Sequence, residues 1–139
     1  MAQQTVLAVD LGAESGRVMA VHAGGEALRL EELHRFPNTT AEVRGTLHWD
    51  FLRLWRDIQE GIGRGQALRP ASLGVDTWGV DFALLDAQGE LLGNPVHYRD
   101  RRTDGMMDWV FARVARAEVF AHTGIQFMPI NTLYQLASL

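Results

Sequence analysis

The sequence predicts a mixed α/β protein, and three features of the chain support this prediction. Three β-rich segments open the chain, an amphipathic helical segment follows them, and an apolar strand segment precedes further helical segments. The chain has 139 residues, of which 47% are hydrophobic. This composition is typical of a folded protein rather than a disordered one, and the length fits a single domain.

The opening segments predict three consecutive antiparallel strands. Thr5 to Asp10 and Arg17 to His22 are β-rich apolar runs, joined by a short glycine-containing segment that is typical of a hairpin. Leu28 to Phe36 continues as a third strand with alternating apolar and charged residues. The alternation breaks at Glu32-Leu33, which predicts a β-bulge there.

The first long helix is expected to begin after Asp50, a residue type that caps helix N-termini. Apolar residues follow at helical spacing, namely Phe51, Leu54, Trp55, Ile58 and Ile62. Three glycines at alternate positions, Gly61, Gly63 and Gly65, are expected to end the helix.

The second half of the chain alternates strand and helix signals. Leu73 to Asp76 predicts a buried strand and Val80 to Leu85 a further one, with a turn at Gln88-Gly89. Met107 to Val114 forms a second helical stripe, and Asn131 is expected to cap a third helix.

Charge and composition exclude several kinds of function. The chain has 13 Lys+Arg and 17 Asp+Glu, a formal net charge of −4, and all thirteen cations are arginine. A weakly acidic chain without a basic block argues against a nucleic-acid partner. Without lysine, the chain has no P-loop lysine and no Schiff-base lysine.

Cysteine and targeting signals are also missing from the sequence. The chain has no cysteine, which excludes disulfides and thiolate metal sites within it. The first residues lack a signal-peptide pattern, and no run approaches the ~20 apolar residues of a membrane span. We therefore expect a cytoplasmic protein without a membrane partner.

The first candidate site is the segment Asp10 to Arg17, where an acid ends a strand and a glycine-containing turn leads into the next strand. Successive backbone N–H groups in such a turn bind phosphate oxygens without lysine. Asp10 is placed to hold magnesium through its water shell, and Arg17 to add a charged contact. The alternative is that Gly12 and Gly16 only provide positive φ angles in a hairpin.

The second candidate is Asp76 to Asp81, which combines two acids, a hydroxyl, an aromatic ring and Gly79 within six residues. Aromatic faces and carboxylates recognise sugars in this combination, and glycine allows a ligand close to the backbone. The alternative is a strand passing through a bend, with Trp78 in the core.

The third candidate is the charged run Tyr98 to Thr103, which follows a probable strand end. It offers arginine and carboxylate groups to a polar cleft. The alternative is an ordinary solvated surface.

The order of these motifs resembles the N-terminal part of the FGGY carbohydrate kinase family, in the actin, Hsp70 and sugar kinase superfamily. The resemblance rests on DLGAESGR, HWD, GVDTWGVDFALLD, YRDRRT and GIQFMPINTLYQL, and covers essentially all of residues 1–139. DTWGVDF favours the branch that phosphorylates L-rhamnulose over the kinases of xylulose and glycerol. The resemblance implies a ribonuclease H-like α/β domain with a mixed five-stranded sheet, of which residues 1–139 are the first part.

The resemblance also implies a reaction, transfer of the ATP γ-phosphoryl group to the C1 hydroxyl of L-rhamnulose, with ATP and Mg2+ as cofactors. The residues that match the phosphate-binding turn are Gly12, Ala13, Glu14, Ser15, Gly16 and Arg17, with Asp10 matching the magnesium position. The residues at or beside sugar-contacting positions are Thr77, Trp78, Gly79, Asp81, Tyr98 and Arg99, with Asp100 as a further polar candidate.

The family's general-base aspartate is expected beyond residue 139, so no residue of this chain is assigned a catalytic role. We expect the chain to be inactive alone and to need the rest of its first domain and a C-terminal domain. Two alternatives stay open: a kinase of another ketose, such as L-fuculose or L-xylulose, and a noncatalytic sugar- or nucleotide-sensing module. An actin-like assembly protein is disfavoured, because it has no evident use for the sugar-facing cluster.

Overall fold

The computed structural model describes residues 4–24 and 27–139, and these form two compact units. The first unit contains the described residues up to Thr40 together with Trp49–Gly79, and the second contains Ala41–His48 and Val80–Leu139. Within the described ranges, no helix combines the length and the apolar character that crossing a membrane requires.

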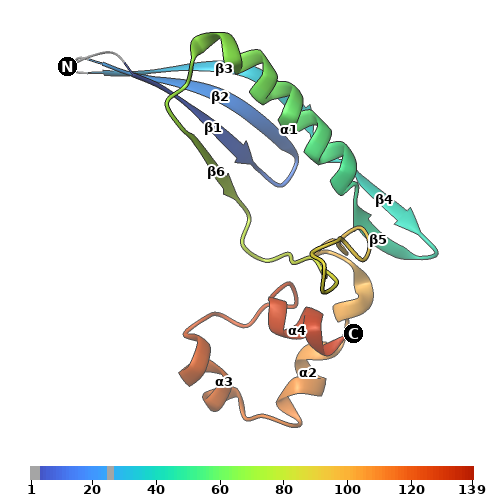
Figure 1. Ribbon diagram of the computed structural model, residues 1–139. Helices are drawn as coiled ribbons and strands as arrows, with labels where there is room; N and C mark the ends of the chain where they lie inside the picture. The colour runs from blue at the N-terminus through green and yellow to red at the C-terminus, as the bar shows by residue number, and fades with distance from the viewer. Residues whose placement is uncertain (1–3, 25–26) are drawn as a thin grey trace. The chain divides into compact units, whose positions relative to one another are not determined.

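The first unit is built on a four-stranded mixed sheet (Figure 1). Its strands, in spatial order, are β3 (Ala27–Pro37), β2 (Ser15–Gly24), β1 (Gln4–Leu11) and β6 (Leu73–Thr77). The first three strands in the chain pair antiparallel, and β6 pairs parallel to β1. The predicted opening hairpin and third strand are confirmed.

The predicted bulge in β3 is also confirmed. Val18 pairs with His34 while Met19 pairs with Glu32, which leaves Leu33 as the extra residue in β3. Since side chains alternate between the two faces of a strand, the extra residue changes which positions face the core. Leu33 itself packs against the buried core.

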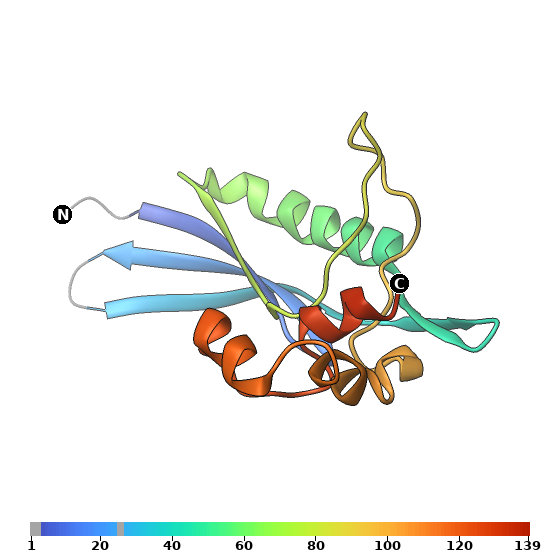
Figure 2. The ribbon, with the colours of Figure 1, turned by 90° about the horizontal axis from the view of Figure 1, so that it is seen from below.

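Helix α1 (Phe51–Gly65) lies along one face of this sheet (Figures 1 and 2). Asp50 is its N-cap as predicted, and the carboxylate accepts a hydrogen bond from the Arg53 N–H at 3.2 Å. Leu54 and Ile58 of the helix pack against the buried cluster Val9, Val18 and Phe36 of the sheet.

The predicted end of this helix at the glycines is confirmed at Gly65, the last residue of α1, but Gly61 and Gly63 do not interrupt the helix. Helix α1 continues directly into a short 3-10 helix, η1 (Gln66–Leu68), and the left-handed residue is Arg69, with φ of 49°. A Cβ at Gly61 would lie 2.3 Å from Val18 Cγ2, and one at Gly65 would lie 2.8 Å from Leu7 Cδ2. These two glycines therefore let the helix approach the sheet closely.

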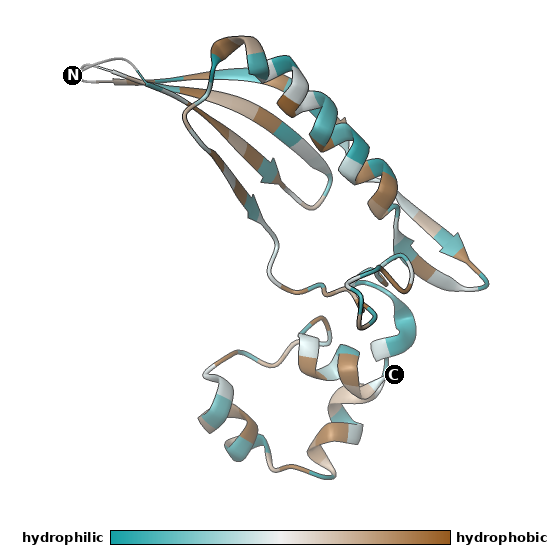
Figure 3. Cartoon of the chain, viewed as in Figure 1, coloured by the Kyte–Doolittle hydropathy of each residue, from teal (hydrophilic) through white to brown (hydrophobic). Residues whose placement is uncertain are grey.

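Strand β6 forms where predicted, but it is not buried. All five of its residues are exposed, and the apolar Val75 is 61% exposed. The physical reason is its position, because β6 is the edge strand of the sheet and α1 packs mainly against β2 and β3. Figure 3 shows the mixed hydropathy of the sheet strands and of α1.

The second unit contains short elements. Strands β4 (Thr40–Val43) and β5 (Thr46–Trp49) form a hairpin. Its residues Ala41–His48 belong to the second unit, and its first and last residues, Thr40 and Trp49, belong to the first. After the hairpin come η2 (Arg101–Thr103), α2 (Met106–Phe111), α3 (Arg116–Thr123) and α4 (Thr132–Ala137). The hairpin and α3 were not predicted. Helix α2 follows the predicted stripe but ends before Val114, and Asn131 occupies the N-cap position of α4.

The predicted strand Val80 to Leu85 is wrong. The described part of this segment contains only an isolated bridge between Leu85 and Leu91. The turn expected there is confirmed, since the Gly89 N–H donates to the Asp86 carbonyl at 3.0 Å and Gly89 has φ of 86°. Val80 and Phe82 are half-buried, but Ala83, Leu84 and Leu85 are exposed, so this second half of the segment lacks the buried neighbours that a longer strand needs.

Candidate functional site

Two acidic residues stand side by side where the parallel strands β1 and β6 end. Asp10 pairs in register with Asp76, and Leu11 with Thr77. Register partners on neighbouring strands point to the same face of the sheet and are about 4.8 Å apart along the hydrogen-bonding direction. The chain therefore places two carboxylates together at the edge from which the turn and the Trp78 segment leave the sheet.

Arg17 lies beside this pair. It is the register partner of Asp10 across the hairpin, and its Nη1 lies 3.8 Å from Asp10 Oδ2. Both side chains are partly exposed, at 40% for Arg17 and 49% for Asp10. The Arg17 Nε is buried and has no hydrogen-bond partner among the described residues. The charge of Asp10 also acts on Arg35, the register partner of Arg17 on β3, which is paired with Glu32. With two guanidinium groups for three carboxylates, the group keeps a net negative charge.

The turn after β1 leaves backbone donors available. The Gly12 N–H donates to the Ser15 carbonyl at 3.0 Å, which closes the turn. Ala13 and Glu14 are exposed, and within the described chain no hydrogen bond from their N–H groups is found. Two neighbouring unbonded N–H groups in a turn are suited to bind an anion.

Asn38, directly after β3, holds this turn, and it was not among the predicted site residues. Its side-chain Nδ2 donates to the Gly12 carbonyl, and its backbone N–H donates to the Glu14 carbonyl at 3.0 Å. A lone asparagine after a strand carries no sequence signal that connects it to a turn 24 residues earlier.

The alternative explanation of the two glycines in the turn is wrong. Neither Gly12 nor Gly16 has a positive φ angle. Gly16 is buried, and a Cβ there would lie 2.2 Å from Phe36 Cε2. Glycine is thus needed at 16 because an aromatic ring packs on the backbone.

The segment after β6 combines an aromatic ring with open space. Trp78 is half-buried and stacks on Trp49, with ring centroids 4.6 Å apart and an interplanar angle of 27°. Trp49 is 3% exposed, so it gives Trp78 a fixed base. Gly79 is exposed, and a Cβ there would meet no atom within 4 Å. Trp78 is therefore neither fully buried nor fully exposed.

The remaining sugar-site candidates belong to the second unit. Tyr98 is half-buried and stacks on His97 at 4.5 Å between centroids, and the Arg99 guanidinium lies 5.2 Å from the Tyr98 centroid. Asp81 is half-buried, and its charge acts on His97 and on Arg102.

His97 and Asp100 hold the segment around Tyr98 in place. The His97 Nδ1 accepts a hydrogen bond from the Arg99 N–H at 3.0 Å, and burial lowers the pKa of His97. Asp100 is 7% exposed, and its carboxylate accepts from the Leu47 N–H at 2.7 Å and the Arg102 N–H at 2.9 Å. The alternative of a solvated run therefore fits Arg101 but not Asp100.

In chemical terms, the first unit gathers a carboxylate pair, a guanidinium and an anion-binding turn on one sheet edge, with an exposed hydroxyl at Thr77. The carboxylate pair suits a hydrated divalent cation, and the turn suits phosphate oxygens. The second unit supplies an aromatic ring bordered by an arginine.

The sequence of the chain is similar to a known family and to curated relatives. The model of the FGGY family of carbohydrate kinases, N-terminal domain, matches residues 5–138. A rhamnulokinase of Pectobacterium atrosepticum is 49% identical over 100% of this chain. A rhamnulokinase of Oceanobacillus iheyensis is 46% identical over 99% of it. The chain spans only 29% and 30% of the length of these two relatives.

Solved structures share the fold of the chain. A ligand-bound xylulose kinase from Lactobacillus acidophilus aligns with a TM-score of 0.79 over 98% of this chain and 28% of that chain, at 17% identity. A gluconate kinase from the same organism aligns with a TM-score of 0.76 over 97% of this chain and 28% of that chain, at 16% identity. These likenesses confirm the predicted α/β, ribonuclease H-like fold.

Proposed function

Because the chain belongs to the FGGY family of carbohydrate kinases, we propose that the whole protein transfers the γ-phosphoryl group of ATP to the C1 hydroxyl of L-rhamnulose. The product is L-rhamnulose 1-phosphate. The family membership supports the reaction class, and the identity of 46–49% to rhamnulokinases over the full chain supports the sugar. L-Fuculose and L-xylulose are the alternative substrates.

The observation that carries this proposal is the register pair Asp10 and Asp76 beside the turn with two unbonded N–H groups. Gly12 to Gly16 forms the turn that receives phosphate oxygens of ATP, and Arg17 adds a charged contact to them. Phosphoryl transfer depends mainly on positioning and charge stabilisation, which such a turn provides.

The same edge fits a magnesium ion by its donor chemistry. Asp10 is half exposed and has a second carboxylate beside it, which suits a cation that keeps much of its water shell. When bound, magnesium supplies positive charge to the phosphate oxygens. The role of Asp10 is to orient the water molecules around the ion, and Arg17 limits the repulsion between the two carboxylates.

Sugar contacts are proposed in each unit separately. Trp78 presents an aromatic surface supported by Trp49, and the open space at Gly79 admits a hydroxyl-bearing ligand close to the backbone. Thr77 is a further proposed contact in the first unit, and Asp81, Tyr98 and Arg99 are the proposed contacts of the second unit.

The general base is not assigned within residues 1–139, so we propose that these residues alone do not catalyse turnover. The chain spans 29% of a related rhamnulokinase, and the remaining part of the whole protein is the proposed partner that completes the site. We also propose a cytoplasmic location, because the reaction consumes ATP.

The test is a kinase assay of the whole protein against L-rhamnulose, L-fuculose, L-xylulose and glycerol, with and without magnesium. We expect the highest kcat/KM for L-rhamnulose. Asp10→Asn is expected to lower kcat at least about 100-fold by removing charge that organises the phosphates, and Gly79→Ala to raise the KM for sugar. Glu42→Gln, at an exposed position of β4, is the control. Unchanged kcat in Asp10→Asn would contradict the proposal.

A further inference from the structure

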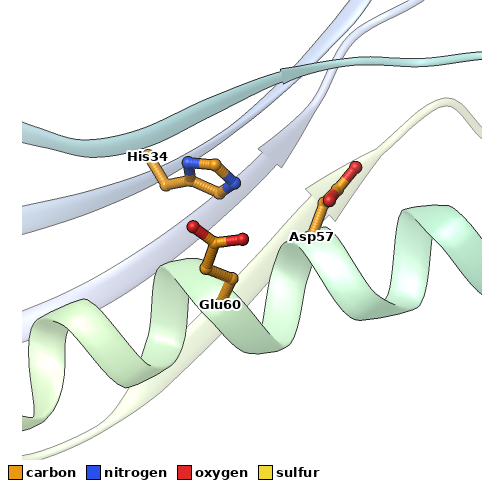
Figure 4. A group of neighbouring side chains, drawn as sticks. All are labelled: His34, Asp57 and Glu60. Carbon is orange, nitrogen blue, oxygen red and sulfur yellow. The ribbon is translucent and has the colours of Figure 1, made fainter.

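A histidine and two carboxylates meet where β3 and α1 pack together (Figure 4). His34 comes from β3, and Asp57 and Glu60 come from α1. Each residue offers one ligand atom, and all these atoms lie within 4.8 Å of one another. None of the three belongs to the residues proposed above to bind ATP or sugar.

Local structure explains why these residues share one place. Asp57 and Glu60 are three positions apart on a helix and therefore lie on the same side of it. On β3, the bulge at Leu33 determines which of the following side chains face α1. His34 and Phe36 both lie toward α1, and their ring centroids are 5.4 Å apart. A Cβ at Gly61 would lie 3.2 Å from His34 Cβ, which confirms how closely the helix approaches this histidine.

Asp57 is buried, His34 is half-buried, and both have incomplete polar partners. The His34 Nε2 is buried and has no hydrogen-bond partner among the described residues. Asp57 is 7% exposed, and its nearest cations are Arg53 at 3.8 Å and Arg56 at 3.6 Å, both beyond good hydrogen-bond length. The unpartnered imidazole nitrogen is destabilising, and the two long ion pairs compensate the burial of the Asp57 carboxylate only in part.

Glu60 has a competing partner. Arg64 donates to it at 2.5 Å and also donates to the Leu33 carbonyl at 3.1 Å. The hydrogen bond from Arg64 is the main cause that lowers the pKa of Glu60, with His34 as a smaller one. Glu60 is therefore an ionised, exposed oxygen ligand. A cation that binds Glu60 must either displace Arg64 or share the carboxylate with it.

We propose that His34, Asp57 and Glu60 bind a divalent transition-metal ion, with zinc as the expected ion. One imidazole nitrogen and two carboxylate oxygens are ligands that zinc accepts, and a single ion would satisfy both buried groups. Tetrahedral zinc ligands are about 3.4 Å apart, so the side chains must close by about 1.4 Å at most. The exposure of Glu60 leaves the fourth position to water.

The effect of this ion is to link β3 to α1. Binding to the folded chain alone stabilises it, and the bulge and the helix become parts of one coordination sphere. The site is independent of the proposed sugar kinase activity, because its ligands are separate residues and its readout is metal binding.

The test is calorimetric titration of the whole protein with zinc chloride, in the absence of ATP and magnesium. We expect one zinc ion to bind with a 1:1 stoichiometry at this site. His34→Asn and Glu60→Gln should each weaken binding about tenfold or more, since each removes one of three ligands. Arg64→Gln should strengthen it about two- to fivefold, because it removes the competitor of the metal.

Two matched controls separate coordination from general charge effects. His48→Asn removes a histidine of the second unit, and Glu32→Gln removes an exposed acid that is paired with Arg35 at 2.7 Å. Both should bind zinc as the wild type does.

Cobalt gives a second readout, because visible absorption bands of bound cobalt should appear in the wild type and disappear in Glu60→Gln, whose exposed position favours normal folding. Equal zinc affinity in the wild type, His34→Asn and Glu60→Gln, or no zinc binding at 1 mM, overturns the proposal.

Discussion

Asp10 on β1 and Asp76 on β6 are register partners on neighbouring parallel strands, so two carboxylates share one face at the end of the sheet. Arg17 lies beside the pair, with its Nη1 3.8 Å from Asp10 Oδ2. Like charges placed next to each other on adjacent strands destabilise a sheet. Folding alone therefore gives no reason for this pair, whereas binding of a hydrated cation does.

Replacing Asp76 with asparagine should separate stability from function. Asp76→Asn removes the repulsion with Asp10, and the free energy of unfolding should rise by about 0.2–1 kcal/mol. Kinase activity of the whole protein should fall, because the edge loses half of its carboxylate charge. Urea unfolding and initial-rate kinetics measure the two effects, with Glu42→Gln as a neutral exposed control. A loss of stability in Asp76→Asn would mean that this carboxylate supports the fold instead.

The three glycines of α1 should respond in opposite directions to substitution by alanine. Gly61→Ala and Gly65→Ala should each destabilise the protein by about 1–3 kcal/mol, because the new methyl group overlaps Val18 or Leu7 in the core. Gly63 is exposed, and a Cβ there meets nothing within 4 Å. Gly63→Ala should therefore stabilise the helix by about 0.5–1 kcal/mol.

Chemical denaturation of the three variants measures these changes. Because all three exchanges are glycine to alanine in one helix, helix propensity cancels in the comparison. Equal effects at positions 61 and 63 would show that α1 does not lie as close to the sheet as described.

Gly16 and Gly79 offer a second matched pair. Gly16→Ala should destabilise the protein by about 1–3 kcal/mol, because its methyl group would overlap the Phe36 ring. Gly79→Ala should leave thermal stability unchanged within about 0.5 kcal/mol, since the space there is open, while weakening sugar binding. Thermal melts with and without L-rhamnulose distinguish the two. A destabilised Gly79→Ala that binds sugar normally would make Gly79 a structural residue.

The element pattern of the first unit was predictable because each signal there is local. Alternation in the opening strands, its break at Glu32-Leu33 and the capping residue Asp50 all act within a few positions. The role of the α1 glycines was not predictable in this way. Their need for close approach comes from Val18 and Leu7, which lie far away in the sequence.

The same distinction between local signals and long-range contacts applies to the candidate site. Asp10 and the turn were predicted from a strand followed by a glycine-containing segment, and the register that brings Asp76 beside Asp10 agrees with the strand ends that the sequence indicated. Asn38 and Trp49 were missed as supports of the turn and of Trp78, because each acts across a long sequence separation. Exposure of β6 was missed because sequence apolarity does not tell an edge strand from a central one.

Gln135 should be a key stabilising residue of the second unit. It is fully buried, and its Nε2 donates to the carbonyls of Val80 at 2.9 Å and Ile130 at 2.8 Å, while its Oε1 accepts from Arg102 at 2.8 Å. Gln135→Leu has a similar volume but leaves the Ile130 carbonyl and the Arg102 guanidinium without these bonds, and the Val80 carbonyl with only the Thr132 hydroxyl at 3.1 Å, so it should cost about 2–4 kcal/mol. Gln135→Glu should also destabilise the unit, because its carboxylate still accepts from Arg102 but faces the Val80 and Ile130 carbonyls without a donor.

Urea unfolding measures both changes, and Gln88→Leu on the exposed turn serves as the control. If Gln135→Leu were as stable as the wild type, the hydrogen bonds that attach α4 to Val80 would contribute nothing measurable to the unit.

Acid should destabilise the second unit through His97. Its imidazole is 6% exposed, and burial lowers the pKa of His97 below its usual value, while the charges of Asp81 and Asp100 oppose this shift and that of Arg99 adds to it. The neutral ring also accepts the Arg99 N–H at Nδ1. A base whose pKa is lower in the folded state binds protons more readily when unfolded, so stability is complete above the unfolded pKa of about 6.5.

As the pH falls below about 6.5 toward the lowered folded pKa of His97, stability should decrease, and protonation should break the hydrogen bond at Nδ1, worth about 1 kcal/mol. His97→Asn keeps an acceptor for the Arg99 N–H but does not titrate. Urea unfolding at pH 7.5 and pH 5 should therefore show a smaller loss of stability in His97→Asn than in the wild type. His122→Asn, at an exposed position on α3, should keep the wild-type loss. An equal loss in His97→Asn and the wild type would assign the acid sensitivity to another group.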